Sequence, residues 1–551
     1  MERNAILAAV LSMAILIGWQ YLVVKPMEDE QAQKQAQEQK AAKARAAAQG
    51  KGRPSAASTP LQAPASGSAA PAAPAAPSAP TEAAPGQRVR VDVGDAVYEL
   101  TNRGAGFLSA RLLKYKQGER NFVQLVPAGQ PDVRPLFFWG GKTAQRLNEA
   151  SYQVEGGDLS LSKSNPEGTL RFVYRGADGL SAEKALTFRH NEFNIRTRIR
   201  VTRPSGDEAM GIVWGPRVGG SDGNTYGGVI EGPMSFVGEE LEYDYPEQAK
   251  PVTHGESLKW TSLQSKHFIA ALIPRAGAGG AEIRLLSQTD DLSEYAAIVP
   301  FAQGKDVDAS FDVYVGPKAV EHLEKLKVNL EDSLDYGMFS FIAKPLMSIL
   351  RFFHGFVGNW GVAIILLTIV VKIIFYPLTH VSMRNMKEMQ KLQPRITQLR
   401  EIYKDDKNRL NEQTMALYKE HKVNPMMGCL PMLIQIPVFF GLYEALLVSI
   451  ELRNAPFFGW VQDLSVQDPY HVYTILMGAS MFLQQKMTPT AGDPTQAKMM
   501  MFMPIIFTGM FIFYPVPVGL VIYWLVNNLL SIAQQFYVNR SVQPPKLAEE
   551  N

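Results

Sequence analysis

Lys372 lies within an apolar run of this 551-residue chain, Val370-Val371-Lys372-Ile373-Ile374-Phe375. A cation in the hydrocarbon of a bilayer costs about 2.5–3.5 kcal/mol on insertion scales, which makes such a lysine a candidate functional residue. Its ammonium could hold an acidic group of a substrate. Alternatively, because Leu378 is only one to two helical turns away, the long side chain could reach the cytoplasmic surface. Its position alone leaves both interpretations open.

Other polar residues interrupt the neighbouring apolar segments. Thr368 precedes Lys372 by one helical turn and shares its face of a helix. The others are Gln435, Asn527, Asn528 and Gln534. If these side chains face inward, they line a wet, basic pocket between helices. A packed polar seam that only joins the helices is the alternative. Glu444 could pair with a cation, and its role is left open.

Composition excludes several function classes. The net charge of +2 gives no general attraction to nucleic acid, and no specific nucleic-acid partner is predicted. The single cysteine rules out an intrachain disulfide. There is no GxxxxGK[ST], HExxH or CxxC motif, so neither a cofactor nor a metal is predicted. The mean hydropathy of -0.08 averages a polar segment at residues 27–87 with an apolar one at residues 340–540.

Two N-terminal segments precede the first domain. Ala5–Val24 is an apolar run long enough to cross about 30 Å of hydrocarbon, and its flanks do not resemble a cleavage site. We therefore expect residues 1–25 to form an uncleaved transmembrane anchor. Residues 26–87 are rich in Ala, Pro, Ser and Gln, which predicts an extended periplasmic linker.

Residues 88–320 predict a periplasmic antiparallel β-sandwich. Apolar and polar residues alternate strictly from Phe193 to Val201, as in strands with one packed and one wet face. An acidic cluster at Glu239, Glu240, Glu242 and Asp244 is interpreted as a solvated loop, and the sequence gives this domain no chemistry.

The C-terminal half predicts a polytopic α-helical membrane protein. In residues 321–356 an apolar, aromatic stretch interrupted by charges favours an amphipathic helix at the membrane surface, in contact with lipids. The helical core is residues 357–540, followed by a cytoplasmic tail, 541–551. Its expected spans are 357–378, 429–450, 471–485, 499–514 and 516–536. Residues 380–425 hold ten Lys/Arg against six Asp/Glu, which marks that loop as cytoplasmic. Together with the anchor, these spans give six transmembrane helices with both termini in the cytoplasm. This topology agrees with the charges of every loop.

The cytoplasmic loop 380–425 predicts a helical hairpin that turns at residues 404–408. Apolar residues recur at steps of three and four. They include Met386, Met389, Leu392, Leu399 and Tyr403. Further methionines, such as Met432 and Met503, offer adaptable side chains that suit contact with varied clients. Plain packing explains these methionines equally well.

The membrane half resembles the YidC/Oxa/Alb insertase family, and the whole layout resembles its Gram-negative form with a large periplasmic domain. The likeness covers roughly residues 335–540 in order. Its motifs include Phe356-Val357-Gly358-Asn359-Trp360-Gly361, Tyr376-Pro377-Leu378-Thr379, Val423-Asn424-Pro425, Gly428-Cys429-Leu430-Pro431, Gln435-Ile436-Pro437 and Phe502-Met503-Pro504.

The resemblance implies a five-helix core around a hydrophilic groove that opens to the cytoplasm and to lipid. Lys372 stands where the family usually has arginine, so charge is kept but the bidentate fork is lost. Thr368 matches a groove hydroxyl, and the family's groove tyrosine maps to Tyr523, with Trp524 as the alternative. The resemblance also implies that ribosomes or targeting factors meet the hairpin, and that the Sec translocon cooperates.

These observations predict a membrane protein insertase and chaperone of the inner membrane, acting on nascent membrane proteins without nucleotide hydrolysis. Because no covalent bond changes, it is not expected to be an enzyme. A secondary transporter of an anionic solute is the alternative, since a cation among polar helices also suits an anion site. Transporters usually show internal repeats, and none is visible.

Overall fold

The computed structural model describes residues 86–541 except 118–120, 128–132, 204–207, 221–230, 248–249, 289–292, 303, 305, 405, 429, 488–493 and 515. The expected anchor, almost the whole linker and the C-terminal tail therefore lie outside the described residues. Two compact units divide the described chain. One contains residues 385–426, and the other contains residues 86–384 and 427–541.

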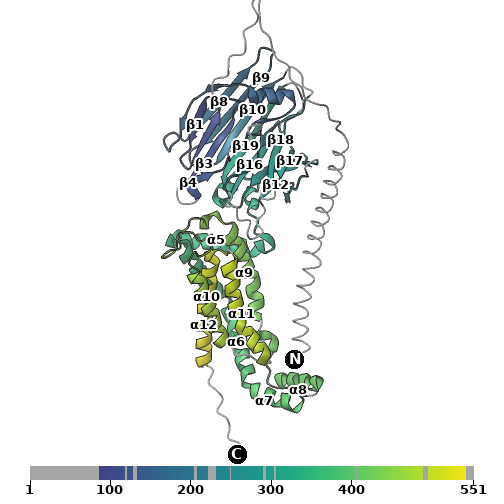
Figure 1. Cartoon of the computed structure of the whole chain (residues 1–551), viewed down its shortest axis with the longest axis vertical. Helices are drawn as coiled ribbons and strands as arrows, with labels where there is room; N and C mark the ends of the chain where they lie inside the picture. Colours follow the sequence, from purple (N-terminus) through teal and green to yellow (C-terminus); the bar gives the residue numbers. More distant parts are fainter. Residues whose placement is uncertain are drawn as a thin grey trace, which may run out of the picture. The chain divides into compact units, whose positions relative to one another are not determined.

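Three β-sheets account for residues 88–317, as the alternating pattern predicts. The largest has nine antiparallel strands, of which β8, β9, β10, β19 and β16 are seen in Figure 1. Its order is β13 (Glu240–Tyr243), β12 (Gly232–Val237), β15 (Leu258–Gln264), β16 (Phe268–Ala276), β19 (Asp306–Pro317), β10 (Asn194–Thr202), β9 (Ser181–Arg189), β8 (Glu167–Arg175) and β6 (Gln153–Glu155). The strand expected at 193–201 is confirmed as β10, whose burial alternates along its whole length.

Two five-stranded sheets complete this β-domain. The first runs β4 (Asn121–Gln124), β3 (Gly106–Gln117), β2 (Ala96–Thr101), β1 (Arg88–Asp92) and β7 (Leu159–Ser160). The second runs β14 (Val252–His254), β17 (Ala281–Gln288), β18 (Ser293–Pro300), β11 (Met210–Trp214) and β5 (Phe138–Gly140), and a short helix α3 (Lys142–Glu149) follows β5. All strand pairs are antiparallel except β1 with β7, which is parallel and departs from the expected pattern.

Aromatic side chains fill the space between the sheets. The ring of Tyr98 on β2 lies 5.7 Å from that of Phe188 on β9, and the ring of Phe107 on β3 lies 5.9 Å from that of Trp214 on β11. All four residues are buried. Layers of sheet with an apolar interior agree with the predicted sandwich, in which strands such as β10 bury one face and leave the other wet. The strand β11 is buried on both faces.

Short helices lead from the β-domain to the helical core. They are α4 (Val320–Leu323), η2 (Glu324–Leu326), η3 (Leu330–Ser333) and η4 (Gly337–Phe339), followed by α5 (Ser340–Val357). The helix α5 buries Ala343, Leu346, Met347 and Leu350, whereas Phe341, Phe352 and Phe356 on it are exposed. An apolar face left open to the surroundings is the property expected of a helix at a membrane surface.

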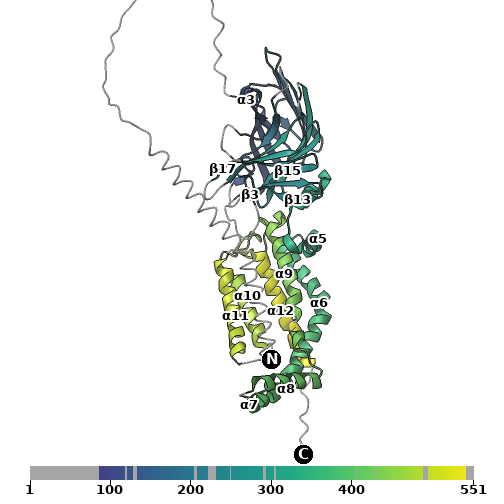
Figure 2. The same cartoon turned by 90° about the vertical axis from the view of Figure 1, so that its right-hand side faces the viewer.

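The core helices run beside one another in Figure 2. They are α6 (Trp360–Lys391), α9 (Leu430–Val448), α10 (Val472–Met487), α11 (Pro494–Phe513) and α12 (Val518–Ser541), with η6 (Ile450–Leu452) after α9. Among the described helices α6 alone is long and apolar enough to span a bilayer, and Leu433–Val448 and Met500–Phe513 are shorter apolar segments. All five expected C-terminal spans are helical, but helix length and composition do not establish their crossing.

The helix α6 extends well beyond the expected end of its span. It continues through Pro377 to Lys391, whereas the apolar run ends near Leu378. The hydroxyl of Thr379 donates to the carbonyl oxygens of Phe375 and Tyr376, at 3.0 and 3.1 Å. Bonds from a threonine hydroxyl to the carbonyl oxygens one turn earlier are common within helices. The first part of the expected hairpin is therefore the end of α6.

Candidate functional site: a polar seam between the core helices

One face of α12 carries a row of polar side chains. Tyr523, Asn527, Ser531 and Gln534 follow one another at steps of four, four and three residues, which places them above one another on a helix. The row faces α6 and α9, because three of its members make hydrogen bonds to those two helices, as described below. Of these four residues, only Ser531 was absent from the sequence prediction.

Lys372 contacts the centre of this row. Its Nζ donates to the Oγ of Ser531 at 2.6 Å, and the Ser531 hydroxyl donates to the backbone oxygen of Asn527 at 2.8 Å. The ammonium is thus held between α6 and α12. The side chain of Lys372 is therefore directed at α12, as both a binding site and a packed polar seam require.

Gln435 and Tyr523 join α9 to the same row. The amide of Gln435 donates to the Tyr523 hydroxyl at 2.5 Å, and Tyr523 is 1% exposed. The Oδ1 of Asn527 is buried and has no hydrogen-bond partner among the described residues. A buried oxygen without a donor is costly, so this atom is available to water or to a bound group.

Two further contacts extend the seam toward the later part of α12. The amide of Gln534 donates to the hydroxyl of Thr379 on α6 at 2.8 Å, and Asn528 donates to Ser480 on α10 at 3.0 Å. These pairs match the alternative reading of intramembrane polar residues, in which they bind helices together. The seam therefore contains both satisfied pairs and the unpartnered Asn527 oxygen.

Thr368 takes part less directly than expected. It is fully buried, and its hydroxyl donates to the backbone oxygen of Ile364 at 2.7 Å, one turn earlier on α6. Its donor is therefore used within its own helix. The structure places Thr368 on the same helix as Lys372 but shows no hydrogen bond from it to α9 or α12.

The two methionines proposed for client contact, Met503 and Met432, lie on different helices. Met503 lies on α11 and is 49% exposed, with exposed Phe502, Ile505 and Ile506 beside it. Its exposure leaves it free to contact lipid or a client. Met432 lies within α9, and its side chain is outside the described part of the structure.

The compact unit of residues 385–426 contains the helical hairpin. It consists of α7 (Gln393–Ile402) and α8 (Lys407–Glu420), so the predicted hairpin and its turn are confirmed. Met389, Leu392 and Ile396 are buried, whereas Met386, Leu399 and Tyr403 are half-buried. The apolar stripe therefore mostly closes the hairpin on itself.

The interpretation of the acidic cluster in the β-domain is wrong for Asp244. This residue is 1% exposed rather than solvated. It accepts hydrogen bonds from the hydroxyl of Ser235 at 2.6 Å and lies 2.6 Å from Nε2 of His254. Glu240 and Glu242 belong to strand β13 rather than to a loop. The cluster was misassigned because burial here depends on strand pairing between β12, β13 and β15, which the local sequence does not reveal.

Within the described ranges, no group of three or more His, Cys, Asp or Glu residues is placed to hold a metal ion. The polar seam instead offers a cation, hydroxyls and amides, which bind polar peptide groups and carboxylates by hydrogen bonding and charge.

The fold and the seam define a class of protein in which a β-rich domain precedes a bundle of apolar helices with polar side chains between them. Residues 88–349 match the family described as YidC periplasmic domain, and residues 352–546 match that described as 60Kd inner membrane protein. The chain belongs to the family of the membrane protein insertase YidC.

Individual relatives match over almost the full chain. The membrane protein insertase YidC of Syntrophus aciditrophicus (strain SB) is 38% identical over 98% of this chain and 100% of its own length. That of Oleidesulfovibrio alaskensis is 37% identical over 98% of this chain and 99% of its own. Among solved structures, an active YidC insertase with its first transmembrane domain resolved is 18% identical, covers 82% of this chain and 92% of its own, and has a TM-score of 0.37.

Proposed function

We propose that this chain inserts newly made membrane proteins into the inner membrane, and helps them fold, through a hydrophilic groove between α6, α9 and α12. The observation that carries the proposal is the contact of Lys372 with Ser531 beside the unpartnered oxygen of Asn527. Thr368, Gln435 and Tyr523 complete the proposed groove. Full-length relatives named as insertases support the same activity.

The mechanism is a lowering of a solvation barrier. Moving a polar flank or a short acidic tail through hydrocarbon costs several kcal/mol, because its hydrogen bonds to water are lost. A hydrated recess partway into the membrane shortens that path, and Lys372 holds an acidic client residue transiently. The apolar segment of the client then partitions into lipid, at about -0.3 to -0.6 kcal/mol per large apolar residue.

This mechanism needs no nucleotide hydrolysis and no covalent change, so the protein acts as an insertase rather than as an enzyme. The driving free energy comes from burial of the client's own apolar segment in lipid. The exposed apolar side chains of α11, including Met503, form the surface along which such a segment passes. Met432 is assigned the same role on α9.

The proposed topology has six transmembrane helices and both termini in the cytoplasm. It is supported by five C-terminal helices at the expected places and by the excess of Lys and Arg in residues 380–425. The short apolar helices cross the bilayer as a bundle, where tilt and local thinning accommodate their length. The helix α5 then lies at the periplasmic surface.

The partners follow from this arrangement. The hairpin of α7 and α8 is the proposed contact for ribosomes or targeting factors, with Met386, Met389, Leu392, Leu399 and Tyr403 shaping it. Its exposed Ile402, 70% accessible, offers an apolar contact at the end of α7. The Sec translocon is the proposed partner for larger clients, and lipids surround the core.

Crosslinking to a stalled client tests the proposal. Photoreactive residues are placed at Asn527 in the seam and at Met503 on α11, with Arg171 on the exposed face of β8 as control. We expect a ribosome-bound membrane protein with one exposed apolar segment to crosslink at both core positions and not at Arg171. A client that crosslinks at neither core position would contradict the proposed path.

A further inference from the structure

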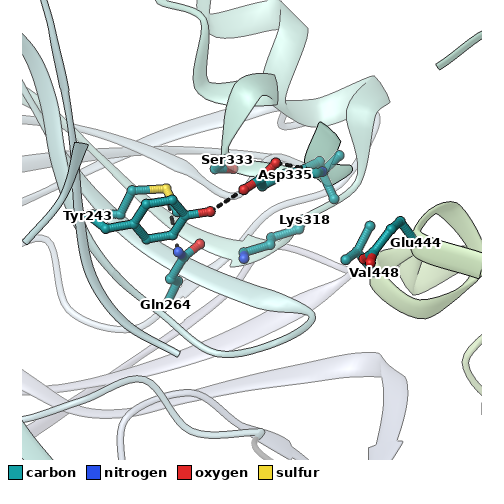
Figure 3. Close-up of a pocket in the computed structure, with 10 residues that line it drawn as sticks. Tyr243, Gln264, Lys318, Ser333, Asp335, Glu444 and Val448 are labelled. Carbon is teal, nitrogen blue, oxygen red and sulfur yellow. Dashed lines mark hydrogen bonds between the residues drawn. The ribbon is translucent and has the colours of Figure 1, made fainter. Parts of the chain in front are cut away.

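A small cavity lies where the β-domain meets the helix α9, away from the polar seam. Its volume is about 130 Å³. Residues from β12, β13 and β15, from the segment after β19 and from α9 line it (Figure 3). A cavity of this size has room for several water molecules or for one small polar molecule.

The cavity contains a buried cation. Lys318 directly follows β19 and is 3% exposed. Its backbone N–H donates to the oxygen of His267 at 2.8 Å, but its ammonium makes no hydrogen bond or ion pair with the residues that the structure describes. Burial lowers the pKa of Lys318 to about 7, while the charges of Glu231 and Asp335 act in the opposite direction.

Two more polar side chains at the cavity lack partners among the described residues. They are the hydroxyl of Ser333, 2% exposed, and Oε1 of Gln264, 4% exposed. Figure 3 shows the side chain of Lys318 between Gln264 and Glu444, with its Nζ on the side of Gln264. Buried polar atoms without partners are rare in folded proteins, and two of them beside the buried Lys318 indicate a site that a polar guest completes.

The carboxylates of the cavity decide which guest fits. Asp335 is already engaged, because the Tyr243 hydroxyl and the backbone N–H of Gly337 donate to it. Glu444 makes no ion pair with any described residue. Two carboxylates beside one ammonium disfavour a simple anion, and the ammonium disfavours a metal ion. A bound molecule with one negative and one positive charge can pair with both the ammonium of Lys318 and the carboxylate of Glu444.

We propose that this cavity binds a compact zwitterion that carries a primary ammonium and an oxyanion. The oxyanion accepts hydrogen bonds from Lys318 Nζ and Ser333 Oγ, and the ammonium donates to the carboxylate of Glu444. Leu334 and Val448 contact its short carbon chain. This site is distinct from the groove proposed for insertion, and neither depends on the other.

Two sources share this chemistry. One is a free solute, such as a small amino acid or phosphoethanolamine, and the other is the headgroup of phosphatidylethanolamine. The membrane surface is close if α9 crosses the bilayer as proposed, because Glu444 lies one turn before its end at Val448. In both sources a short chain joins an ammonium to an oxyanion, with three bonds between N and O in a small amino acid and five in phosphoethanolamine and in the headgroup.

Binding of phosphoethanolamine to the purified full chain tests the inference. The protein is placed in nanodiscs of phosphatidylcholine, and saturation-transfer NMR measures the Kd. We expect saturable binding, with inorganic phosphate alone and ethanolamine alone at least about tenfold weaker, because each lacks one charge-assisted contact. Replacing part of the phosphatidylcholine by phosphatidylethanolamine then raises the apparent Kd if the headgroup is the guest, and leaves it unchanged if a free solute is.

Substitutions of the two charged residues, Lys318 and Glu444, complete the test. K318M and E444Q each raise the Kd by at least about tenfold, whereas K325M, at an exposed lysine of η2, leaves it unchanged. Unaltered thermal unfolding and gel-filtration profiles show that each variant is folded. The absence of saturable binding to the wild-type chain, or equal binding of phosphate and phosphoethanolamine, would overturn the proposal. Neither result would bear on insertion activity, which is measured separately.

Discussion

Lys372 and Ser531 differ in how far their place in the polar seam could be predicted from the sequence. A lysine within an apolar run is visible in any sequence, so Lys372 could be selected from its position alone. Ser531 could not, because a serine in a helix usually donates to its own backbone and carries no signal. Only the steps from Tyr523 to Asn527, Ser531 and Gln534 indicate a shared face, and that pattern could have found it.

The charge of Lys372 should matter for clients with acidic tails. We expect K372A to lower insertion of such a client into proteoliposomes at least about tenfold, because a charge-assisted hydrogen bond is lost. K372R should retain most activity, since the charge remains. S531A should give a smaller loss, because the ammonium stays but its position on α12 is no longer fixed.

A client whose acidic residues are changed to amides serves as the control. Its insertion should be nearly the same with wild-type protein and K372A. An equal loss for acidic and neutral clients would show that Lys372 supports the helices rather than the client.

Lys184 in the β-domain is a buried lysine with a different role. It is fully buried on β9, and its Nζ donates to the backbone oxygens of Gly104, Ala105 and Leu136, at 2.9, 3.4 and 2.5 Å. Burial lowers the pKa of Lys184. The three carbonyl contacts and the ring of Phe138, 4.2 Å away, solvate the ammonium in place of water.

Replacing Lys184 should therefore destabilise the β-domain. K184M leaves carbonyl oxygens without donors, and we expect it to lower the free energy of unfolding by about 2–4 kcal/mol. Pulse proteolysis of the full chain in urea measures the effect, with the exposed Lys163→Met as control. A change of less than about 0.5 kcal/mol, typical of surface positions, would show that the carbonyls find other partners.

At the scale of elements, the strands and helices with a regular sequence pattern were predicted well. Features that depend on tertiary contacts were not. The alternation from Phe193 to Val201 predicted β10 because each strand residue alternates between two environments. The continuity of α6 from Leu378 to Lys391 was missed, since the apolar run ends near Leu378 and the tertiary contacts of the turns that follow cannot be read from the sequence. The burial of Asp244 was missed for the same reason.

The start of α8 offers a test of the hairpin. The side chain of Asp406 accepts a hydrogen bond from the backbone N–H of Arg409 at 3.0 Å and caps the helix. We expect D406A to destabilise α8 by about 1 kcal/mol, whereas D406N should be nearly neutral because asparagine caps equally well. Hydrogen exchange of the first turns of α8 should be faster in D406A by about fivefold. Equal exchange in both variants would mean that α8 is held by other contacts.

At the scale of the whole molecule, the sequence predicted the division into β-domain and helical core. Apolar and polar residues alternate in the first part, whereas long apolar runs dominate the second. The contacts that join them were not predictable. The guanidinium of Arg453, after η6, lies 5.6 Å from the ring centre of Phe268, and the amide of Asn454 donates to the backbone oxygen of Lys116 at 3.3 Å. Such contacts, and the cavity at Lys318, link residues hundreds of positions apart.

Removal of most of the β-domain should distinguish an insertase from a periplasmic scaffold whose helices serve only as a membrane anchor. We expect a chain lacking residues 90–315 to retain most insertion of a short client, because the polar seam contains residues of α6, α9, α10 and α12 only. Insertion is measured by protease protection of the client. A full-length chain with K372A is the matched control and should lose activity. If the deletion abolished insertion while the remaining core stayed folded, a scaffold role would be favoured.

Water access to the seam tests the central claim most directly. The single cysteine is first changed by C429S, and a new cysteine is then placed by N527C in the seam or by L529C on the exposed side of α12. In intact vesicles, a membrane-impermeant maleimide added from the cytoplasmic side should label N527C and leave L529C unlabelled, because lipid covers the latter. Both should label after solubilisation and unfolding. Protection of N527C equal to that of L529C in the vesicles would contradict a hydrated recess around Lys372.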